Sequence, residues 1–308
     1  MAGLFSANSM AILAKGSDYF GVDGFPVTTR LVRTTPDRGA SHPHDYTEVA
    51  HYHDFSELVL VLEGRGTHRL GAESFPVSAG DVFVIQGRQV HSFGDRDGLV
   101  LLNVMYDPAR LPLPVELLRR IPGYSALFLL EPRFRRTHAF SSRLRLDREA
   151  LGVAEDLGTR IGAEAEDARP GHEAMLLSWL TSLIVFLSRS YHDNLTRESR
   201  SLLRLGRLIS SLEQGYAEAW DLAKLAESAK LSRASLLRIF REATGKSPIA
   251  YLIELRIAAA KRLLLQSEKG VTEIAFEVGF NDANYFARQF RLVAGCTPTE
   301  FRRRGRRF

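Results

Sequence analysis

Arginines recur at helical spacing in two stretches of the C-terminal third of the chain, joined in the second by an asparagine. If each stretch is a helix, the outward side chains are Ala234, Leu237, Arg238 and Arg241 in the first and Asn284, Ala287, Arg288 and Arg291 in the second. In a DNA major groove, arginine donates two hydrogen bonds to guanine, asparagine pairs with adenine, and apolar side chains contact the thymine methyl group. A single basic helix is more often a solvated surface, so the surrounding sequence has to decide between the two interpretations.

A second group of chemically capable side chains lies in the N-terminal half. His51 and His53 are separated by one residue, Glu57 follows them, and His91 lies further along the chain. Alternate residues of a strand share a face, so His51 and His53 point the same way, and Glu57 joins them if the strand keeps its parity. The sequence therefore predicts a pocket lined by polar side chains.

The arginine-bearing stretches belong to an internal repeat between Leu222 and Arg304. The first copy reads LAKLAESAKLSRASLLRIFREATGKSPIAYL and the second reads VTEIAFEVGFNDANYFARQFRLVAGCTPTEF. The copies are in step at Phe240 and Phe290, Gly245 and Gly295, Pro248 and Pro298, and Tyr251 and Phe301. Two copies in register favour DNA binding over a merely solvated helix face.

Each copy predicts a helix, a tight turn and a second helix. The expected N-caps are Asp221 and Ser232 in the first copy and Thr272 and Asp282 in the second. Gly245 and Gly295 end the second helices, and the turns lie at Ala229 to Leu231 and at Gly279. The sides facing the core are expected to be Leu236, Ile239, Phe240 and Ala243 in one helix and Phe286, Phe290 and Val293 in the other.

Proline and a capping box continue the pattern beyond each pair of helices. A long helix from about Pro248 to Gln266 joins the two copies, because proline is tolerated at a first helical position. Thr297 and Glu300 have the spacing of a capping box that opens a last helix. The sequence thus predicts two helix-turn-helix units on one connecting helix.

This repeat resembles the DNA-binding domain of the AraC/XylS family of transcription regulators. The likeness covers roughly Leu202 to Phe308 and is most specific in IAFEVGFNDANYFARQFRLVAGCTPTEFR. The resemblance implies contacts with double-stranded DNA at Ala234, Leu237 and Arg238, and at Asn284, Ala287 and Arg288.

Positive charge is confined to this part of the chain. Residues 202–308 hold 19 Lys and Arg against 11 Asp and Glu, whereas residues 1–201 hold 22 against 25. Phosphate contacts need such a surplus, and a ligand-sensing domain does not. The arginines at the end of the chain, Arg306 and Arg307 among them, are expected to add sequence-independent affinity.

Short β-branched and aromatic runs from Phe25 to Tyr106, separated by turn residues, predict an antiparallel barrel or sandwich. The spacing of its histidines resembles the cupin signature, although Gln86 stands where that signature usually has proline. By this resemblance His51, His53, Glu57 and His91 surround a divalent transition metal, with Gly64, Gly80 and Gly87 at turns. The alternative, which needs no cofactor, is a pocket whose imidazoles hydrogen-bond an effector or one another.

A strongly apolar helix is expected from Glu173 to Tyr191, too short for a membrane span. This helix either packs within the core of the chain or forms a homodimer interface with a second copy. In the second case Leu180 and Ile184 are expected to lie in the interface. The polar stretch 192–201 is interpreted as a linker. The predicted organisation is an α+β chain: a cupin-like effector-binding domain (1–170), a helical dimerisation and connector region with linker (171–201), and a double helix-turn-helix domain (202–308).

Taken together, the domains resemble the sugar-responsive branch of the AraC/XylS family, most of all its rhamnose-responsive regulators. The resemblance implies an activator that binds a small sugar or related carbohydrate through His51, His53, Glu57 and His91, works as a homodimer and acts on RNA polymerase. One cysteine and an N-terminus without a signal-peptide pattern favour the cytoplasm and no membrane.

Two alternatives remain open at this point. A metal-dependent cupin enzyme, an oxygenase or isomerase, can be fused to a DNA-binding domain and use the four predicted ligands. Against it, the sequence shows no further group of acid and base residues, so no catalytic residue is assigned. The other alternative is a DNA-binding protein that responds to no ligand and uses the barrel only to dimerise.

Overall fold

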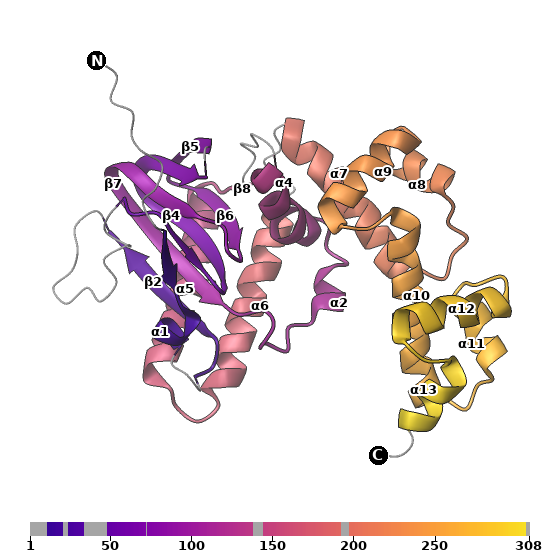
Figure 1. Ribbon diagram of the computed structural model, residues 1–308. Helices are drawn as coiled ribbons and strands as arrows, with labels where there is room; N and C mark the ends of the chain where they lie inside the picture. The colour runs from indigo at the N-terminus through magenta and orange to yellow at the C-terminus, as the bar shows by residue number, and fades with distance from the viewer. Residues whose placement is uncertain are drawn as a thin grey trace. The chain divides into compact units, whose positions relative to one another are not determined.

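The computed structural model describes residues 11–20, 24–33, 48–71, 73–137, 144–191 and 197–305 (Figure 1). The chain divides into two compact units, Met1–Leu203 and Arg204–Phe308, called here the sheet domain and the helical domain. A β-rich first domain and an all-helical second domain confirm the predicted fold class. Helix α7 (Arg197–Gln214) begins inside the stretch predicted as a linker, so residues 197–201 are helical, and residues 192–196 lie outside the described residues.

One sheet contains the eight strands of the described residues. These strands are β1 (Ile12–Ala14), β2 (Val27–Val32), β3 (His51–His53), β4 (Ser56–Leu70), β5 (Glu73–Ser78), β6 (Asp81–Gln86), β7 (His91–Tyr106) and β8 (Leu144–Arg145). Their order is β1-β3-β7-β4-β6-β8, with β2 also paired to β7 and β5 also paired to β4. The strands between Phe25 and Tyr106 pair antiparallel, as predicted, and the preceding strand β1 adds to the sheet by pairing parallel with β3.

The two long strands β4 and β7 pair with each other along most of their length, and the register of this pairing shifts near Gly64. Gly64 has φ +68°, and a Cβ there would lie 2.2 Å from the carbonyl group of Gly98. Only glycine permits so close an approach of the two strands at a bulge. Gly64 is therefore a bulge residue within β4, whereas Gly80 and Gly87, with φ of +93° and +63°, lie outside the strands as predicted.

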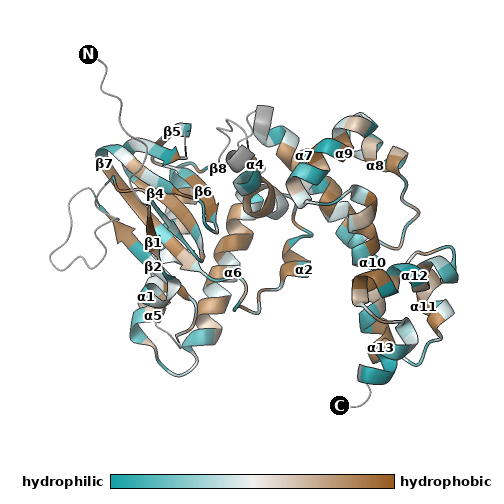
Figure 2. Cartoon of the chain, viewed as in Figure 1, coloured by the Kyte–Doolittle hydropathy of each residue, from teal (hydrophilic) through white to brown (hydrophobic). Residues whose placement is uncertain are grey.

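Two antiparallel helices cover part of the sheet, α5 (Arg148–Asp167) and α6 (His172–Ser190). Asp147 caps α5 by accepting a hydrogen bond from the Ala150 amide at 2.9 Å. In the hydropathy colours of Figure 2, α6 is mostly brown, in keeping with its packing against α5, α3 and β2. Leu180 and Ile184 are at most 1% exposed in a single chain. A dimer seam built from these two residues is therefore excluded, because they already form core.

The remaining helices of the sheet domain are short. They are α1 (Gly16–Phe20), α2 (Val115–Leu118), α3 (Pro122–Tyr124), the π-helical turn η2 (Ser125–Leu130) and α4 (Glu131–Thr137). Gln86 at the end of β6 donates from Nε2 to the Phe128 carbonyl at 2.6 Å, which ties the sheet to η2. The Tyr191 hydroxyl donates to Glu131 Oε1 at 2.6 Å and holds the end of α6 against α4.

The helical domain contains α8 (Leu222–Ala229), α9 (Arg233–Thr244), α10 (Pro248–Gln266), α11 (Val271–Glu277), α12 (Ala283–Ala294) and α13 (Pro298–Gly305), together with most of α7. The predicted repeat is confirmed down to its aromatic packing. Phe240 meets Tyr251 edge to face at 5.6 Å and 73°, and Phe290 meets Phe301 at 5.6 Å and 74°. Each half of the domain thus packs an equivalent edge-to-face pair, phenylalanine with tyrosine in the first and two phenylalanines in the second.

Candidate functional site

The first helix-turn-helix unit consists of α8 and α9. Asp221 accepts a hydrogen bond from the Lys224 amide at 2.7 Å, and Ser232 accepts one from the Ser235 amide at 3.2 Å, so both predicted N-caps are confirmed. Lys230, with φ +54°, forms the tight turn between the helices, and Gly245 at φ +77° ends α9. Leu236, Phe240 and Ala243 are buried, which fixes the opposite face of α9 toward solvent.

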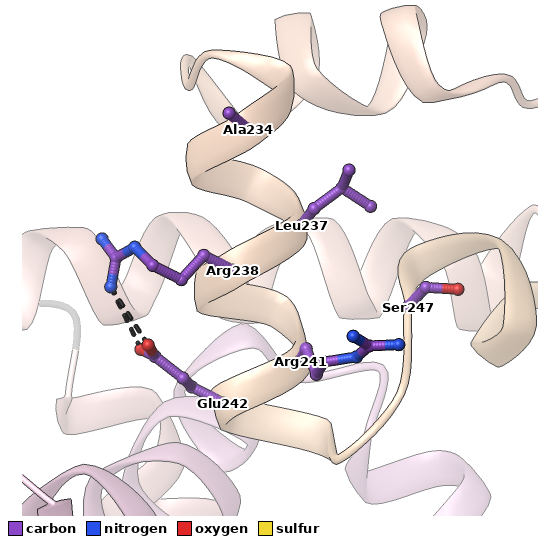
Figure 3. Close-up of a pocket in the computed structure, with 6 residues that line it drawn as sticks. All are labelled: Ala234, Leu237, Arg238, Arg241, Glu242 and Ser247. Carbon is purple, nitrogen blue, oxygen red and sulfur yellow. Dashed lines mark hydrogen bonds and ion pairs between the residues drawn. The ribbon is translucent and has the colours of Figure 1, made fainter.

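That opposite face of α9 presents the predicted DNA-reading residues. Ala234, Leu237, Arg238 and Arg241 are all exposed. Together with Glu242 and Ser247 they line a depression of about 640 Å³ (Figure 3). Arg238 is directed at Glu242, and Nη1 donates to Glu242 Oε1 at 3.1 Å, while Arg241 extends toward Ser247. Three of the six lining residues are charged, and each of them lies on α9.

The second unit, α11 and α12, repeats this arrangement. Asp282 caps α12 by accepting hydrogen bonds from the amides of Asn284 and Tyr285 at 2.7 and 3.2 Å, as predicted. The predicted cap at Thr272 is wrong: Gly270 is the N-cap of α11, and its carbonyl accepts the first helical hydrogen bond from Ile274 at 2.9 Å. Burial of Ile274 and Ala275 sets the start of this helix and leaves Thr272 exposed within its first turn.

The outward face of α12 carries Asn284, Arg288 and Arg291, which are exposed, and Ala287, which is partly buried. The Arg288 guanidinium lies over the Tyr285 ring, 5.7 Å from its centroid. Phe286 and Phe290 are buried as predicted, but Val293 is 41% exposed and does not belong to the core. Phe301 of α13 covers Phe290 instead, so Val293 is left at the edge of the helix.

In chemical terms, each exposed face combines guanidinium donors with apolar or amide side chains at matching helical positions. Such a face can form paired hydrogen bonds to guanine and adenine edges and methyl contacts to thymine.

At the far end of the domain, Thr297 and Glu300 form the predicted capping box, with reciprocal hydrogen bonds of 2.9 and 3.2 Å. The backbone hydrogen bond from Thr297, the largest cause, lowers the pKa of the Glu300 carboxyl. Arg306 and Arg307 lie outside the described residues.

The predicted histidine cluster lies inside the sheet domain, on neighbouring strands. His51 and His53 come from β3, Glu57 from β4 and His91 from β7, and all four side chains are buried. His51 faces His91 directly in the sheet register, which brings residues forty positions apart into contact. The structure thus brings the four predicted residues together.

Three of these residues converge on one point. His53 Nε2 and His91 Nε2 lie 3.5 and 3.4 Å from Glu57 Oε2. His51 is not one of the three: its Nδ1 lies 3.3 Å from the Val49 carbonyl, and its ring is tilted by 56° against that of His91, with 4.2 Å between the centroids. Within the described residues, His53, Glu57 and His91 form the one group whose ligand atoms lie close enough to hold a metal ion.

Two further polar residues belong to this cluster and were not predicted. Asn103 on β7 donates from Nδ2 to Glu57 Oε1 at 2.7 Å. His68 on β4 is buried, stacked between Phe83 and Phe93 with both centroids at 4.8 Å. A weak signal was available for Asn103, which is a lone polar residue in an apolar run, but His68 is flanked by Thr67 and Arg69 and gives no such signal. The positions of both depend on the pairing of β4 with β7.

Burial raises the pKa of the Glu57 carboxyl, but the neighbouring imidazoles of His53 and His91 outweigh burial and hold this pKa well below its usual value. The ionised form of Glu57 is therefore favoured inside the domain. A buried anion of this kind requires a positive partner close by.

Comparison with known proteins assigns a family model to each of the two domains. A family model of the AraC-like ligand binding domain matches residues 37–180, and a helix-turn-helix domain model matches residues 225–304. The HTH-type transcriptional activator RhaR of Enterobacter sp. (strain 638) is 32% identical over 259 residues, 83% of this chain and 88% of the relative. The chain belongs to the AraC family of transcriptional regulators. RhaR of Mannheimia succiniciproducens is 30% identical over 257 residues, 82% of this chain and 87% of the relative.

As an AraC family member, the protein binds DNA through its helical domain and a small-molecule ligand through its sheet domain. The family consists of regulators and not of enzymes, which overturns the alternative of a cupin oxygenase or isomerase. Among solved structures, the DNA-binding domain of AdpA in complex with a target DNA is 33% identical and covers 34% of this chain and 94% of that chain, with a TM-score of 0.32. None of the helices in the described part of the chain has the length and apolar character needed to span a membrane.

Proposed function

We propose that this AraC family protein is a transcriptional activator that responds to a small sugar. The observation that carries the proposal is the match to relatives named HTH-type transcriptional activator RhaR, which extends over both domains. The buried polar side chains of the sheet domain support it, because sugar hydroxyls are recognised by imidazole, carboxylate and amide groups. His51, His53, Glu57 and His91 are the residues assigned to this ligand.

We infer further that the two exposed helix faces read DNA. Arg238 and Arg288 are assigned to base edges, together with Ala234, Leu237, Asn284 and Ala287. Arg241 and Arg291 stand one turn further along the same faces and are assigned to the groove or to the phosphates beside it. The exposure of seven of these eight side chains supports the assignment, since a buried residue cannot contact DNA without unfolding.

The partners of the proposed activator follow from the same family resemblance. We infer a homodimer whose seam excludes Leu180 and Ile184, because both are buried within a single chain. Sedimentation velocity of the full chain tests this inference: a species of twice the chain mass is expected, and a monomer at all concentrations contradicts it. Activation further implies a contact with RNA polymerase.

A ligand screen tests the proposed function most simply. The purified full chain is heated in the presence of a panel of small sugars, rhamnose among them, with amino acids and fatty acids as the comparison compounds. A ligand at about 100 times its Kd stabilises the protein by about 2.7 kcal/mol, so one sugar is expected to raise Tm clearly. The same sugar is expected to raise transcription from a reporter carrying the selected DNA site.

Variants locate the response in the sheet domain. His51→Ala is expected to abolish the Tm shift given by the sugar and the reporter response, while leaving DNA binding in place. His172→Ala is the matched control, because its partly exposed imidazole at the start of α6 lies outside the cluster. Stabilisation by no sugar, or an unchanged response in the His51→Ala protein, contradicts the proposal.

A further inference from the structure

Among the buried polar atoms that make no hydrogen bond within the described part of the chain, three lie together at one point of the sheet domain. They are His53 Nε2, Glu57 Oε2 and His91 Nε2. Their residues are at most 5% exposed, so solvent does not supply the missing partners. Leaving a buried polar group unsatisfied destabilises a fold by about 1 to 3 kcal/mol. Three such atoms at one point indicate a component that completes the site.

The hydrogen bonds on the far side of each ring determine what that component has to be. His53 Nδ1 lies 2.8 Å from the Phe55 carbonyl, and His91 Nδ1 lies 3.0 Å from the Gln89 carbonyl. A carbonyl oxygen can only accept, so each Nδ1 carries the hydrogen. In a neutral ring, Nε2 then carries a lone pair and no hydrogen. The Nε2 atoms of His53 and His91 both face Glu57 Oε2, which is also a hydrogen-bond acceptor, so none of the three atoms can donate to another. Such an arrangement is stable only with positive charge between the three atoms.

We propose that His53, Glu57 and His91 bind a divalent first-row transition metal ion through Nε2, Oε2 and Nε2. Ligand bonds of about 2.0 to 2.2 Å place neighbouring ligand atoms roughly 3 to 3.5 Å apart. The two imidazole-to-carboxylate distances, 3.5 and 3.4 Å, fit this spacing. All three atoms lie within 4.8 Å of one another. Imidazole and carboxylate ligands suit zinc, iron, cobalt or nickel.

The residues around the three ligands hold them as in known metal sites. Metal-binding histidines usually donate their other ring N–H to a carbonyl or carboxylate, which fixes the ring and its tautomer. His53 and His91 both do so. Asn103 holds Glu57 Oε1 at 2.7 Å and leaves Oε2 for the ion. Three protein ligands leave a coordination position open, where an oxygen of a bound molecule can enter.

The competing explanation is a proton. If one imidazole is protonated at Nε2, it donates to Glu57 and the cluster needs no ion. The metal proposal predicts that the purified protein binds a metal ion at this site, whereas the proton explanation predicts that it does not. Neither explanation depends on which sugar, if any, is the effector.

Cobalt is the probe for this test. Full-length protein without a histidine tag is stripped with a chelator, loaded with Co²⁺, freed of excess metal and analysed for cobalt per chain and by X-ray absorption. One Co²⁺ per chain is expected, with scattering from two imidazoles. Glu57→Gln and His53→Ala are expected to lose this binding, whereas His172→Ala retains it. Asn103→Ala is expected to bind Co²⁺ about 10- to 100-fold more weakly, because it removes a group that orients a ligand.

Two results overturn the proposal: wild-type protein that retains no stoichiometric cobalt, or equal cobalt in the wild-type and Glu57→Gln proteins. Circular dichroism checks that the variants fold. If they do not, the absorption spectrum of the wild-type protein decides, since a cobalt site lacking two imidazole ligands contradicts the assignment. Stabilisation by a sugar in metal-free wild-type protein with no cobalt site would leave the proposed function standing and remove the metal proposal alone.

Discussion

At the scale of single residues, Arg238 and Arg288 occupy matching positions of the repeat but have different neighbours. Arg238 is paired with Glu242, which is four residues further along α9. Arg288 lies over the Tyr285 ring, and the counterpart of Glu242 on α12 is Leu292, which is 77% exposed. If α9 reads DNA as proposed, Arg238 has to leave its acidic partner before it can bind a base, and Glu242 would place negative charge near the DNA.

We predict that Glu242→Gln tightens DNA binding. An exposed ion pair is worth about 0.2 to 1 kcal/mol, so its removal is expected to lower Kd by up to about fivefold. Fluorescence anisotropy with a DNA fragment carrying the selected site measures the change. Glu254→Gln is the control, because Glu254 on α10 pairs with Lys246, which precedes that helix, and the substitution changes the net charge equally. Equal effects of the two substitutions would assign the change to net charge and not to Arg238.

Residues of the sheet-domain cluster divide into those that sequence could predict and those that it could not. His51, His53, Glu57 and His91 are spaced as in a known signature, so their meeting was predictable. Asn103 and His68 enter the cluster through the pairing of β4 with β7, whose register includes a bulge near Gly64. A bulge changes which side chains face the same way, and no local pattern reports it.

At the scale of elements, helix ends are the features best predicted from sequence. Asp221, Ser232 and Asp282 cap helices through a hydrogen bond two or three residues away, so the whole signal is local. Thr272 shows the limit of this signal. The start of α11 is set by burial of Ile274 and Ala275, which overrides the preference of threonine for an N-cap.

We predict that Asp282→Ala destabilises the helical domain and that Thr272→Ala leaves it almost unchanged. Loss of an N-cap side chain lowers the free energy of unfolding by about 0.5 to 2 kcal/mol. Thr272 is exposed and is not the cap of α11. Urea unfolding of the two variants, followed by circular dichroism, measures the difference. A loss of stability in Thr272→Ala as large as that in Asp282→Ala would show that threonine does cap α11 in solution.

The turn of the second helix-turn-helix unit depends on Gly279. Its φ is +94°, and a Cβ at this position would lie 2.6 Å from the Ala217 carbonyl oxygen. Gly295 also has positive φ, +74°, but nothing lies within 4 Å of its Cβ position. Substitution of Gly295 therefore tests backbone strain alone, whereas substitution of Gly279 tests strain together with a steric collision.

We predict that Gly279→Ala lowers stability more than Gly295→Ala. A left-handed conformation costs an alanine about 1 to 2 kcal/mol, which is the whole effect expected at Gly295. Gly279→Ala adds a collision with the Ala217 backbone and is expected to weaken DNA binding as well, because it displaces the turn that leads into α12. Thermal unfolding and DNA-binding titrations of both variants measure the effects. Similar losses in the two proteins would contradict the close approach of Gly279 to Ala217.

At the scale of the whole molecule, the division of charge between the domains agrees with their separate tasks. Residues 202–308 carry the surplus of Lys and Arg, while residues 1–201 carry a small excess of Asp and Glu. Composition and the repeat were sufficient to predict two domains of different class. The parallel pairing of β1 with β3 was not predictable, because it joins segments about forty residues apart through backbone hydrogen bonds alone.

The central claim is that α9 and α12 read two segments of DNA independently of each other. Helix-turn-helix units held by one connecting helix are expected to meet successive major-groove segments about one helical turn apart. Each base-reading arginine is then worth about 1 to 3 kcal/mol at its own segment. Selection of binding sites from random DNA, carried out with wild type, Arg238→Ala and Arg288→Ala, measures this most directly. Each variant is expected to lose base preference at one segment and to keep it at the other, whereas a uniform loss of affinity with unchanged preference would contradict base reading by these helices.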